Sequence, residues 1–294
     1  MPDTQNENEN KQRKDETNGT ESRYDRQKRL FGKCGQRRLV SARVALVGLG
    51  GIGSHVAQQL AYLGLRDYVL IDPDHVTPSS LNRLIGAVER DAVEERFKVE
   101  IAERTIAAIQ PRAKVRSLPM PLAADTVQLA LADRHVVIAG LDDDLARIEL
   151  IKTCLAAGIP FFDAASDINT ESEPIIWGGR VAFSGQGERC PYCLDLLDQR
   201  AMQRGLMDAE QRAADAAIYG VSAKALAGAG PAVVSVNGVI ASLLVTELMA
   251  WRTGLREPWP LLTYRGGVVL RSLDEPRAGC PYCASWPRAA DRAA

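Results

Sequence analysis

The sequence predicts an α/β fold with a doubly wound, mainly parallel sheet, late antiparallel strands and a clip of four cysteines. Three observations indicate this fold. Short β-rich runs alternate with segments of helical apolar spacing as far as residue 164. A glycine loop at residues 48–53 joins the first β-rich run to a helical segment. Two identical Cys-Pro-Tyr-Cys tetrapeptides occupy residues 190–193 and 280–283.

The expected elements follow from apolar periodicity and from the residues that stop it. The segment 93–109 carries apolar or small residues at helical spacing, and Pro111 stops it because proline cannot continue a helix. We expect strands at residues 43–47, 68–71, 114–118, 136–139 and 160–164, with helices at 51–63, 93–109, 123–131 and 145–157. After Pro174 we expect a strand or hairpin at 175–183, helices at 208–218 and 231–250, and two strands within 261–273.

Length and composition predict a globular protein without general affinity for nucleic acid or membranes. The 294 residues are 46% hydrophobic, which is enough to bury a full core, and the formal net charge is -1. The apolar run at 231–250 is interrupted by Asn237, Glu247 and other polar residues that are costly in hydrocarbon, so we expect a packed helix and no membrane span. No apolar stretch follows the start of the chain, which predicts a cytoplasmic protein with reduced cysteines.

The chain is expected to form one domain, residues 23–283, between two tails. Residues 1–22 contain almost nothing apolar and cannot offset the entropy of ordering, so we expect a disordered tail there. Residues 284–294 are expected to form a C-terminal tail. No internal repeat is visible apart from the doubled tetrapeptide.

The glycine loop predicts a Rossmann-like nucleotide site. Gly48, Gly50 and Gly53 allow a tight turn that presents backbone amides and a helix N-terminus to phosphate oxygens. Asp72 ends the second expected strand, where an acid can bind ribose hydroxyls. This pattern fits NAD, FAD, S-adenosylmethionine or ATP, and a glycine-rich turn without a ligand is the alternative.

Further motifs narrow the choice of ligand. They are Arg-Tyr-Asp-Arg-Gln at 23–27, Gly-Leu-Gly-Gly-Ile-Gly-Ser at 48–54, Asp-Pro-Asp at 72–74, Leu-Asn-Arg at 81–83, Lys-Val-Glu at 98–100 and Leu-Asp at 141–142. In order and spacing they resemble the ubiquitin-activating superfamily of ThiF and MoeB type, from about residue 23 to residue 283. The resemblance implies a homodimer that uses ATP to adenylate a C-terminal carboxylate. The substrate would be a small ubiquitin-like or sulfur-carrier protein that ends in Gly-Gly.

The resemblance also implies roles for charged residues. Arg83 and Lys98 match the ligands of the triphosphate, Asp142 matches the aspartate that holds magnesium, and Arg26 matches an arginine that reaches in from the other subunit. These charges suit a reaction in which a carboxylate attacks the α-phosphorus and pyrophosphate leaves. The full set expected at the ATP site is Gly48, Gly50, Gly51, Gly53, Asp72, Asp74, Ser80, Arg83, Lys98 and Asp142.

Each role has a simpler alternative. Arg26 and Arg83 fit solvated surface charges equally well in isolation, and Lys98 fits an exposed helix face. Asp143 and Asp144 extend Asp142 into an acidic triplet that also suits capping of the helix that follows. Family members usually carry asparagine at the position of Ser80, whose hydroxyl offers fewer hydrogen-bonding groups than an amide.

The two tetrapeptides predict a structural zinc site. Cys190, Cys193, Cys280 and Cys283 supply four thiolates, the ligand set of a closed zinc site. The separation between the two pairs is far longer than in a compact zinc ribbon, but the superfamily resemblance implies zinc at this place. The competing interpretation is redox chemistry, since Cys-Pro-Tyr-Cys is also the glutaredoxin tetrapeptide; that motif belongs early in a small βαβ unit.

The remaining cysteines argue against a thioester step. Residues 194–279 contain no cysteine, Cys154 lies in an apolar helical pattern typical of a core residue, and Cys34 lies near the Arg26 segment. The acyl-adenylate is therefore expected to pass to a separate thiol, amine or sulfur donor.

Two other functions remain open. One is activation of another carboxylate or of a tRNA nucleoside, and the other is a nucleotide-binding scaffold without catalysis. Among the histidines, His55 and His135 are expected to be structural, and His75 is expected near the nucleotide.

Overall fold

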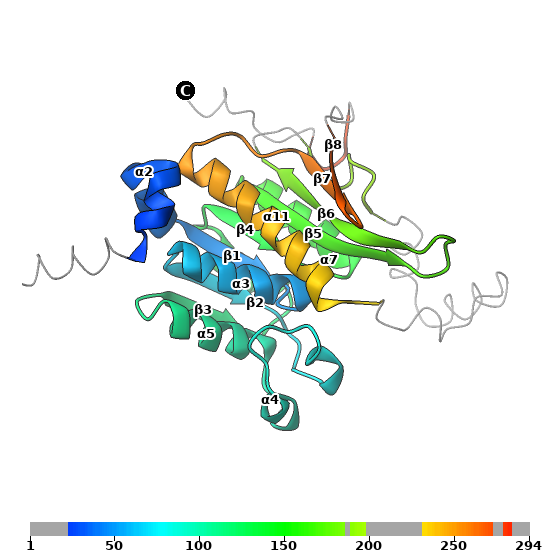
Figure 1. The fold of residues 1–294 in the computed structure, drawn as a ribbon, viewed down its shortest axis with the longest axis horizontal. Helices are drawn as coiled ribbons and strands as arrows, with labels where there is room; N and C mark the ends of the chain where they lie inside the picture. The colour runs from blue at the N-terminus through cyan, green and yellow to red at the C-terminus, as the bar shows by residue number, and fades with distance from the viewer. Residues whose placement is uncertain (1–22, 186–188, 198–230, 273–278, 284–294) are drawn as a thin grey trace, which may run out of the picture.

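The structure, a computed structural model, describes residues 23–185, 189–197, 231–272 and 279–283 (Figure 1). The tails expected at 1–22 and 284–294 and the helix expected at 208–218 lie outside these residues. An eight-stranded sheet has the order β3-β2-β1-β4-β5-β6-β7-β8. Its strands are β1 (Arg43–Val47), β2 (Asp67–Ile71), β3 (Lys114–Leu118), β4 (Val136–Ala139), β5 (Phe161–Asn169), β6 (Ile176–Ser184), β7 (Leu261–Arg265) and β8 (Val268–Ser272).

The strand directions confirm the predicted sheet. β1 pairs in parallel with β2 on one side and with β4 on the other, and β2 with β3 and β4 with β5 are also parallel. β6, β7 and β8 add to the sheet in antiparallel pairs. The strand order reverses between β1 and β4, because the chain leaves β1 towards β3 and then returns. In open parallel sheets, ligands bind beyond the carboxyl ends of the strands at such a reversal.

Helices cover both faces of the sheet (Figure 1). Alternate residues of β1 point to opposite faces, so Val44 and Leu46 belong to one buried cluster, and Ala45 and Val47 to another. The first cluster includes residues of α2 (Asp25–Val40), α3 (Gly51–Leu63), α5 (Lys98–Ile109) and α11 (Val234–Thr253). The second includes residues of α6 (Asp125–Leu131) and α7 (Asp144–Ala157).

The single helix expected at 93–109 is wrong at its start. The short helix α4 (Glu89–Val93) ends there, and α5 begins only at Lys98. Phe97 is extended, with φ -66° and ψ 144°, and its amide donates to the Glu100 carboxylate at 2.8 Å. The amide of Val76 donates to the Arg96 carbonyl at 2.8 Å. The chain therefore folds back on the loop after β2, which brings Lys98 to the first turn of α5 beside that loop.

The strand β5 extends beyond the expected 160–164 because β6 pairs with it along its whole length. The pairs run from Phe161 with Ser184 to Asn169 with Ile176. This extension carries residues 165–168 to the carboxyl edge of the sheet, past the end of β4. The two late strands expected within 261–273 are confirmed as the hairpin of β7 and β8.

The helix α11 confirms the predicted packed helix at 231–250, shifted towards the C-terminus. By length and composition alone α11 is apolar enough to cross a membrane, although 50% of its most apolar window is buried inside the fold. Ile240 and Leu244 are fully buried, and the helix packs on α2, α3, β5 and β6. The buried half of its apolar surface therefore belongs to the core.

Candidate active site

The glycine loop is held by close backbone contacts between β1 and α3. Gly48 has φ 82°, a conformation that favours glycine, and a Cβ there would lie 2.7 Å from the Gly140 carbonyl oxygen. A Cβ at Gly53 would lie 2.0 Å from the Gly48 carbonyl oxygen. Gly50 differs, because a Cβ there would meet nothing within 4 Å. Gly48 and Gly53 thus allow the turn to close, whereas Gly50 faces open space.

Asp72 fixes this loop from the end of β2. Its carboxylate is buried and accepts hydrogen bonds from the Leu49 amide at 2.6 Å and from the Asp74 amide at 2.9 Å. Burial raises the pKa of Asp72 above its ordinary value, and the nearby Lys98 ammonium opposes that rise. Besides any contact with ribose, Asp72 therefore orients the glycine loop.

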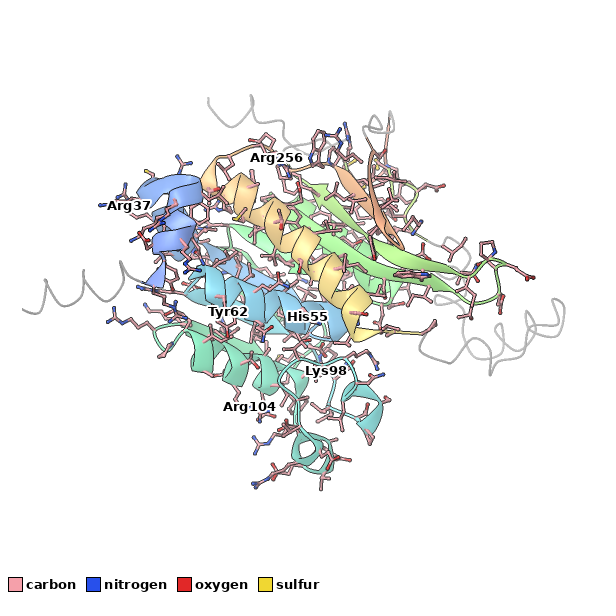
Figure 2. All side chains as sticks on the ribbon, in the orientation of Figure 1. Arg37, His55, Tyr62, Lys98, Arg104 and Arg256 are labelled. Carbon is pink, nitrogen blue, oxygen red and sulfur yellow. The ribbon has the colours of Figure 1, made fainter. Side chains whose placement is uncertain are left out.

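Two predicted cations approach the loop from its flank. The Lys98 ammonium lies 2.7 Å from the Asp74 carboxylate, and the Lys98 amide donates to the Asp74 carbonyl at 2.9 Å. Figure 2 shows Lys98 at the end of α5 that faces the loop carrying α4. A Cβ at Gly51 would lie 3.5 Å from Cδ of Arg83, so Arg83 reaches the start of α3. Both side chains are partly buried at the glycine loop.

The three aspartates of the acidic triplet after β4 have different surroundings. The carboxylate of Asp143 accepts the Ala146 amide at 2.8 Å, which confirms the capping alternative for this residue. Asp144 forms an ion pair with Arg147 inside the first turn of α7. Asp142 is exposed at the carboxyl end of β4. Asp142 is therefore the member of the triplet that is most accessible to a ligand.

These groups line one cleft of about 940 Å³ at the carboxyl edge of the sheet. The predicted site residues on its wall are Gly48, Gly50, Gly51, Asp72, Asp74, Arg83, Lys98 and Asp142. Three others lie off the wall. Gly53 packs against Gly48, the Ser80 hydroxyl accepts the Thr77 amide at 3.3 Å, and Arg26 is exposed on α2. His75, expected near the nucleotide, follows the cleft residue Asp74 and packs on Phe97, with ring centroids 4.0 Å apart.

Sequence reasoning missed other residues on the cleft wall. Arg147 from α7, Arg180 from β6 and Asn237 from α11 all line the cleft. The sequence does contain a signal for Arg147, because it is a charged residue on the otherwise apolar, buried face of the helix expected at 145–157. Arg180 and Asn237 give no such signal, because their position depends on the antiparallel addition of β6 and on the packing of α11 against α3.

The four cysteines of the tetrapeptides meet on the α7 side of the sheet. Their sulfurs all lie within 4.8 Å of one another, with Cys190 to Cys280 at 3.8 Å and Cys193 to Cys283 at 3.2 Å. Four sulfurs around a tetrahedral zinc at about 2.3 Å lie about 3.8 Å apart. The two tetrapeptides thus form one four-thiol cluster that can hold a metal ion, rather than two separate dithiols.

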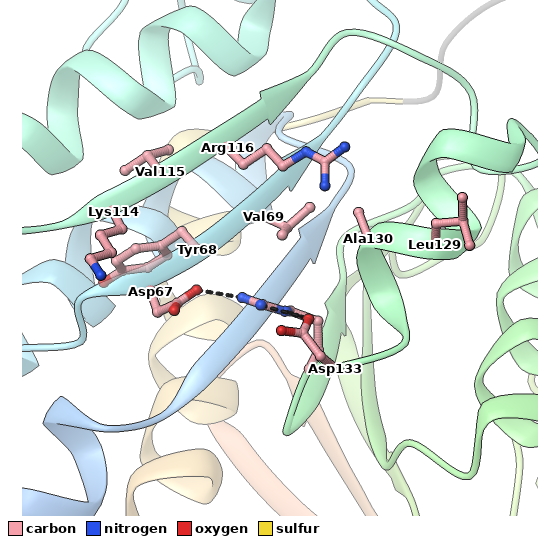
Figure 3. Close-up of a pocket in the computed structure, with 10 residues that line it drawn as sticks. Asp67, Tyr68, Val69, Lys114, Val115, Arg116, Leu129, Ala130 and Asp133 are labelled. Atoms are coloured by element: carbon pink, nitrogen blue, oxygen red, sulfur yellow. Dashed lines mark hydrogen bonds and ion pairs between the residues drawn. The ribbon is translucent and has the colours of Figure 1, made fainter.

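A smaller hollow of about 420 Å³ lies at the opposite, amino edge of the sheet (Figure 3). The guanidinium of Arg134 is almost buried there and forms ion pairs with Asp67 and with Asp133, the latter at 2.6 Å. Dashed lines in Figure 3 mark these interactions of Asp67 and Asp133. The positive charge of Arg134 in this hollow is therefore already neutralised by two aspartates of the protein.

The fold and the cleft define a Rossmann-like α/β protein whose glycine loop and flanking cations meet at a strand reversal. The ThiF family model matches residues 24–269, and the chain belongs to the ThiF family. This membership confirms the resemblance inferred from the sequence motifs.

Relatives share both sequence and fold. The molybdopterin-synthase adenylyltransferase of Escherichia coli is 34% identical over 180 residues, which cover 60% of this chain and 68% of the relative. The sulfur carrier protein ThiS adenylyltransferase of E. coli is 28% identical over 274 residues, or 89% of this chain and 94% of that protein. The crystal structure of E. coli MccB with MccA-N7isoAsn has a TM-score of 0.70 at 19% identity and covers 90% of this chain and 75% of that one. This structural likeness supports the fold.

Proposed function

We propose that this protein uses ATP to adenylate the C-terminal carboxylate of a small ubiquitin-like or sulfur-carrier protein that ends in Gly-Gly. The observation that carries the proposal is the shared cleft. The glycine loop, the buried acid Asp72 and the flanking cations meet there at the strand reversal. The names of the adenylyltransferase relatives support the same reaction.

The site residues suit charge neutralisation. Gly48, Gly50 and Gly51 border the phosphate side, and Asp72 and Asp74 are assigned to the ribose side. Arg83 and Lys98 offset the charge that develops on the triphosphate as the carboxylate attacks the α-phosphorus and pyrophosphate leaves. Asp142 is a carboxylate ligand of the kind that magnesium prefers, and the ion would neutralise phosphate charge. Gly53 supports the loop from behind, and Ser80 supports it through the turn that carries Arg83.

The product is expected to leave as an acyl-adenylate, without a thioester on this chain. None of the six cysteines lines the cleft: four form the cluster, Cys154 is fully buried in α7 and Cys34 is exposed on α2. Burial also raises the pKa of the Cys154 thiol far above its ordinary value, which disfavours the reactive thiolate. A separate thiol, amine or sulfur donor would therefore complete the reaction, in the cytoplasm.

A homodimer is proposed because Arg26 is exposed and lies off the cleft of its own chain. If Arg26 completes the site of the other subunit, a mixture of Arg26→Ala and Asp142→Ala chains regains activity, since one site of each heterodimer keeps both residues. No recovery after confirmed subunit exchange would exclude a trans role for Arg26.

The four-thiol cluster is proposed to hold one structural zinc ion per chain. In the metal-free protein, burial raises the pKa of Cys190 to about 12, so binding would replace thiol protons with metal. Metal analysis of protein purified without added zinc is expected to give a ratio near one. Metal-free protein with a reversible dithiol would support the redox interpretation instead.

Pyrophosphate exchange tests the proposed reaction. Purified protein is expected to exchange labelled pyrophosphate into ATP only when a Gly-Gly carrier protein and magnesium are present. Lys98→Ala is expected to slow exchange about a hundredfold, while Lys152→Ala, which removes an exposed lysine on α7, leaves it unchanged.

Ligand-induced thermal shifts separate this reaction from the other candidates. Stabilisation by ATP, but not by NAD or S-adenosylmethionine, is expected. ATP binding without exchange for any carrier would favour a scaffold or a different acyl substrate, and exclusive stabilisation by NAD would overturn the proposal.

A further inference from the structure

The cleft continues beyond the glycine loop to Arg180 on β6. Residues of β5 and β6, among them Ala165, Asp167 and Arg180, line this far end together with Leu196. Arg180 is the cation among them, and burial lowers its pKa below the ordinary value while nearby Asp163 opposes that change. A guanidinium in this position has lost much of its contact with water.

The donors of Arg180 are incompletely satisfied. Its Nη2 donates to the Leu196 carbonyl at 2.8 Å, whereas its Nε is buried and has no hydrogen-bond partner among the described residues. A buried donor without a partner costs about 1–3 kcal/mol. Because Arg180 lines the cleft, a ligand that supplies an acceptor to this guanidinium would offset part of that cost.

Neighbouring charges leave Arg180 available to a ligand. Asp163 is 1% exposed, and its Oδ1 accepts a hydrogen bond from Nε of Arg147 at 3.1 Å. In the sheet register Arg180 stands opposite Ala165, so Asp163 is its diagonal neighbour, at a typical separation of about 7–8 Å. Arg147 therefore binds one oxygen of Asp163, while Oδ2 is buried without a hydrogen-bond partner among the described residues. Arg180 forms no ion pair with Asp163 within the described part of the chain and stands at the next position towards the cleft mouth.

The strand order sets the distance from the reacting phosphate. The glycine loop follows β1, and β4 and β5 separate it from β6. Neighbouring strands lie about 4.8 Å apart, so three steps place β6 about 14 Å from the loop. An extended peptide spans about 3.3–3.6 Å per residue, so about four residues bridge this distance.

We propose that Arg180 is a specificity-determining residue, which binds a backbone carbonyl of the acyl substrate about four residues before its C-terminus. The assignment rests on the proposed adenylation of a C-terminal carboxylate. A carbonyl is an acceptor that every extended tail carries, so this contact reads the presence and length of an extended tail rather than its side chains. The terminal carboxylate then lies towards Asp142 and the phosphates.

A length series of peptides tests this assignment without requiring turnover. Synthetic peptides of two, three, four, five and six residues, all ending in Gly-Gly with a free carboxylate, are titrated calorimetrically into the full chain with magnesium and a non-hydrolysable ATP analogue. The wild-type affinity is expected to rise about ten- to hundredfold once the peptide reaches about four residues, the gain typical of a hydrogen bond from a charged donor.

The variants identify the residue responsible for this rise. Arg180→Met is expected to abolish the rise and to keep the affinity for the nucleotide analogue, which shows that the variant is folded. Arg180→Lys is expected not to restore it, because a lysine ammonium lacks the planar fork of donors. Arg112→Gln, a change at an exposed arginine after α5, is the matched control and keeps the rise.

The outcomes separate the two proposals. A length-dependent rise that persists in Arg180→Met would overturn the role of Arg180 and leave adenylation intact. Failure of the wild-type chain to bind any of these peptides, despite binding the nucleotide, would overturn the Gly-Gly substrate and this assignment together. A loss of nucleotide affinity in both Arg180→Met and Arg180→Lys would show a structural role and also overturn the assignment.

Discussion

The two ends of β4 carry aspartates in opposite situations. Asp133 precedes the strand, at the amino edge, and forms an ion pair with Arg134 at 2.6 Å. Asp142 follows the strand, at the carboxyl edge, and no described residue forms a hydrogen bond or an ion pair with its side chain. The Asp133 carboxylate is thus neutralised by a neighbouring arginine, whereas the Asp142 carboxylate is open to a ligand in the cleft.

Replacing the two aspartates is expected to give the largest contrast. Asp142→Asn removes the carboxylate proposed to hold magnesium and is expected to lower pyrophosphate exchange about 10²–10³-fold, the usual effect of losing one group that stabilises developing charge. Asp133→Asn is expected to change exchange less than about twofold, because its side chain is 64% exposed and lies at the other edge. Equal losses from both variants would remove the distinction between the two edges.

The contrast between the two edges was only partly predictable from the sequence. The parallel strands, the glycine loop and the meeting of Asp72 with Asp142 follow from local patterns, since residues that end parallel strands of one sheet lie at one edge. The meeting of the two cysteine pairs was likewise expected. These predictions depended on spacing within single segments or on a motif repeated in the chain.

The remaining features depend on contacts between distant segments. The break before α5 follows from pairing of residues 96 and 97 with the loop after β2, which apolar periodicity does not report. Arg180 reaches the cleft only because β6 pairs along the extended β5. Ser80 lies off the cleft wall because its hydroxyl forms hydrogen bonds with Thr77. Comparing serine with the asparagine usual at this position does not reveal these bonds.

Two glycines of the loop, Gly53 and Gly50, differ in the space that a Cβ atom would find. Gly53→Ala is expected to lower the free energy of unfolding by about 3 kcal/mol, because its Cβ would lie 2.0 Å from a backbone oxygen that cannot move aside. Gly50→Ala is expected to cost at most about 1 kcal/mol, since its Cβ enters open space and only capping is affected. Urea unfolding of both variants measures these free energies, and ATP affinity is measured alongside. Equal losses of unfolding free energy would show that both glycines have the same packing role.

The smallest expected effect concerns a charge pair that the protein satisfies internally. The Asp91 carboxylate on α4 is 2% exposed and accepts two hydrogen bonds from Arg104, at 2.8 and 2.6 Å. These bonds hold the pKa of Asp91 below its ordinary value. Because the folded-state pKa lies below the unfolded one, the stabilisation is fully present above the unfolded pKa and is lost as pH falls through the folded pKa.

Replacement of Asp91 should therefore affect stability in a pH-dependent way and leave catalysis unchanged. Asp91→Asn is expected to lower the free energy of unfolding by about 1 kcal/mol at neutral pH, a modest figure because Arg104 is 46% exposed and water screens the pair. The difference from the wild-type chain should shrink below about pH 4, where the unfolded carboxylate already binds a proton. Urea unfolding between pH 3 and pH 7 measures this change, with Asp125→Asn on α6 as the exposed control. If the difference in unfolding free energy stays constant with pH, Asp91 stabilises α4 by packing rather than by charge. If Asp91→Asn loses pyrophosphate exchange, Asp91 acts on the cleft as well.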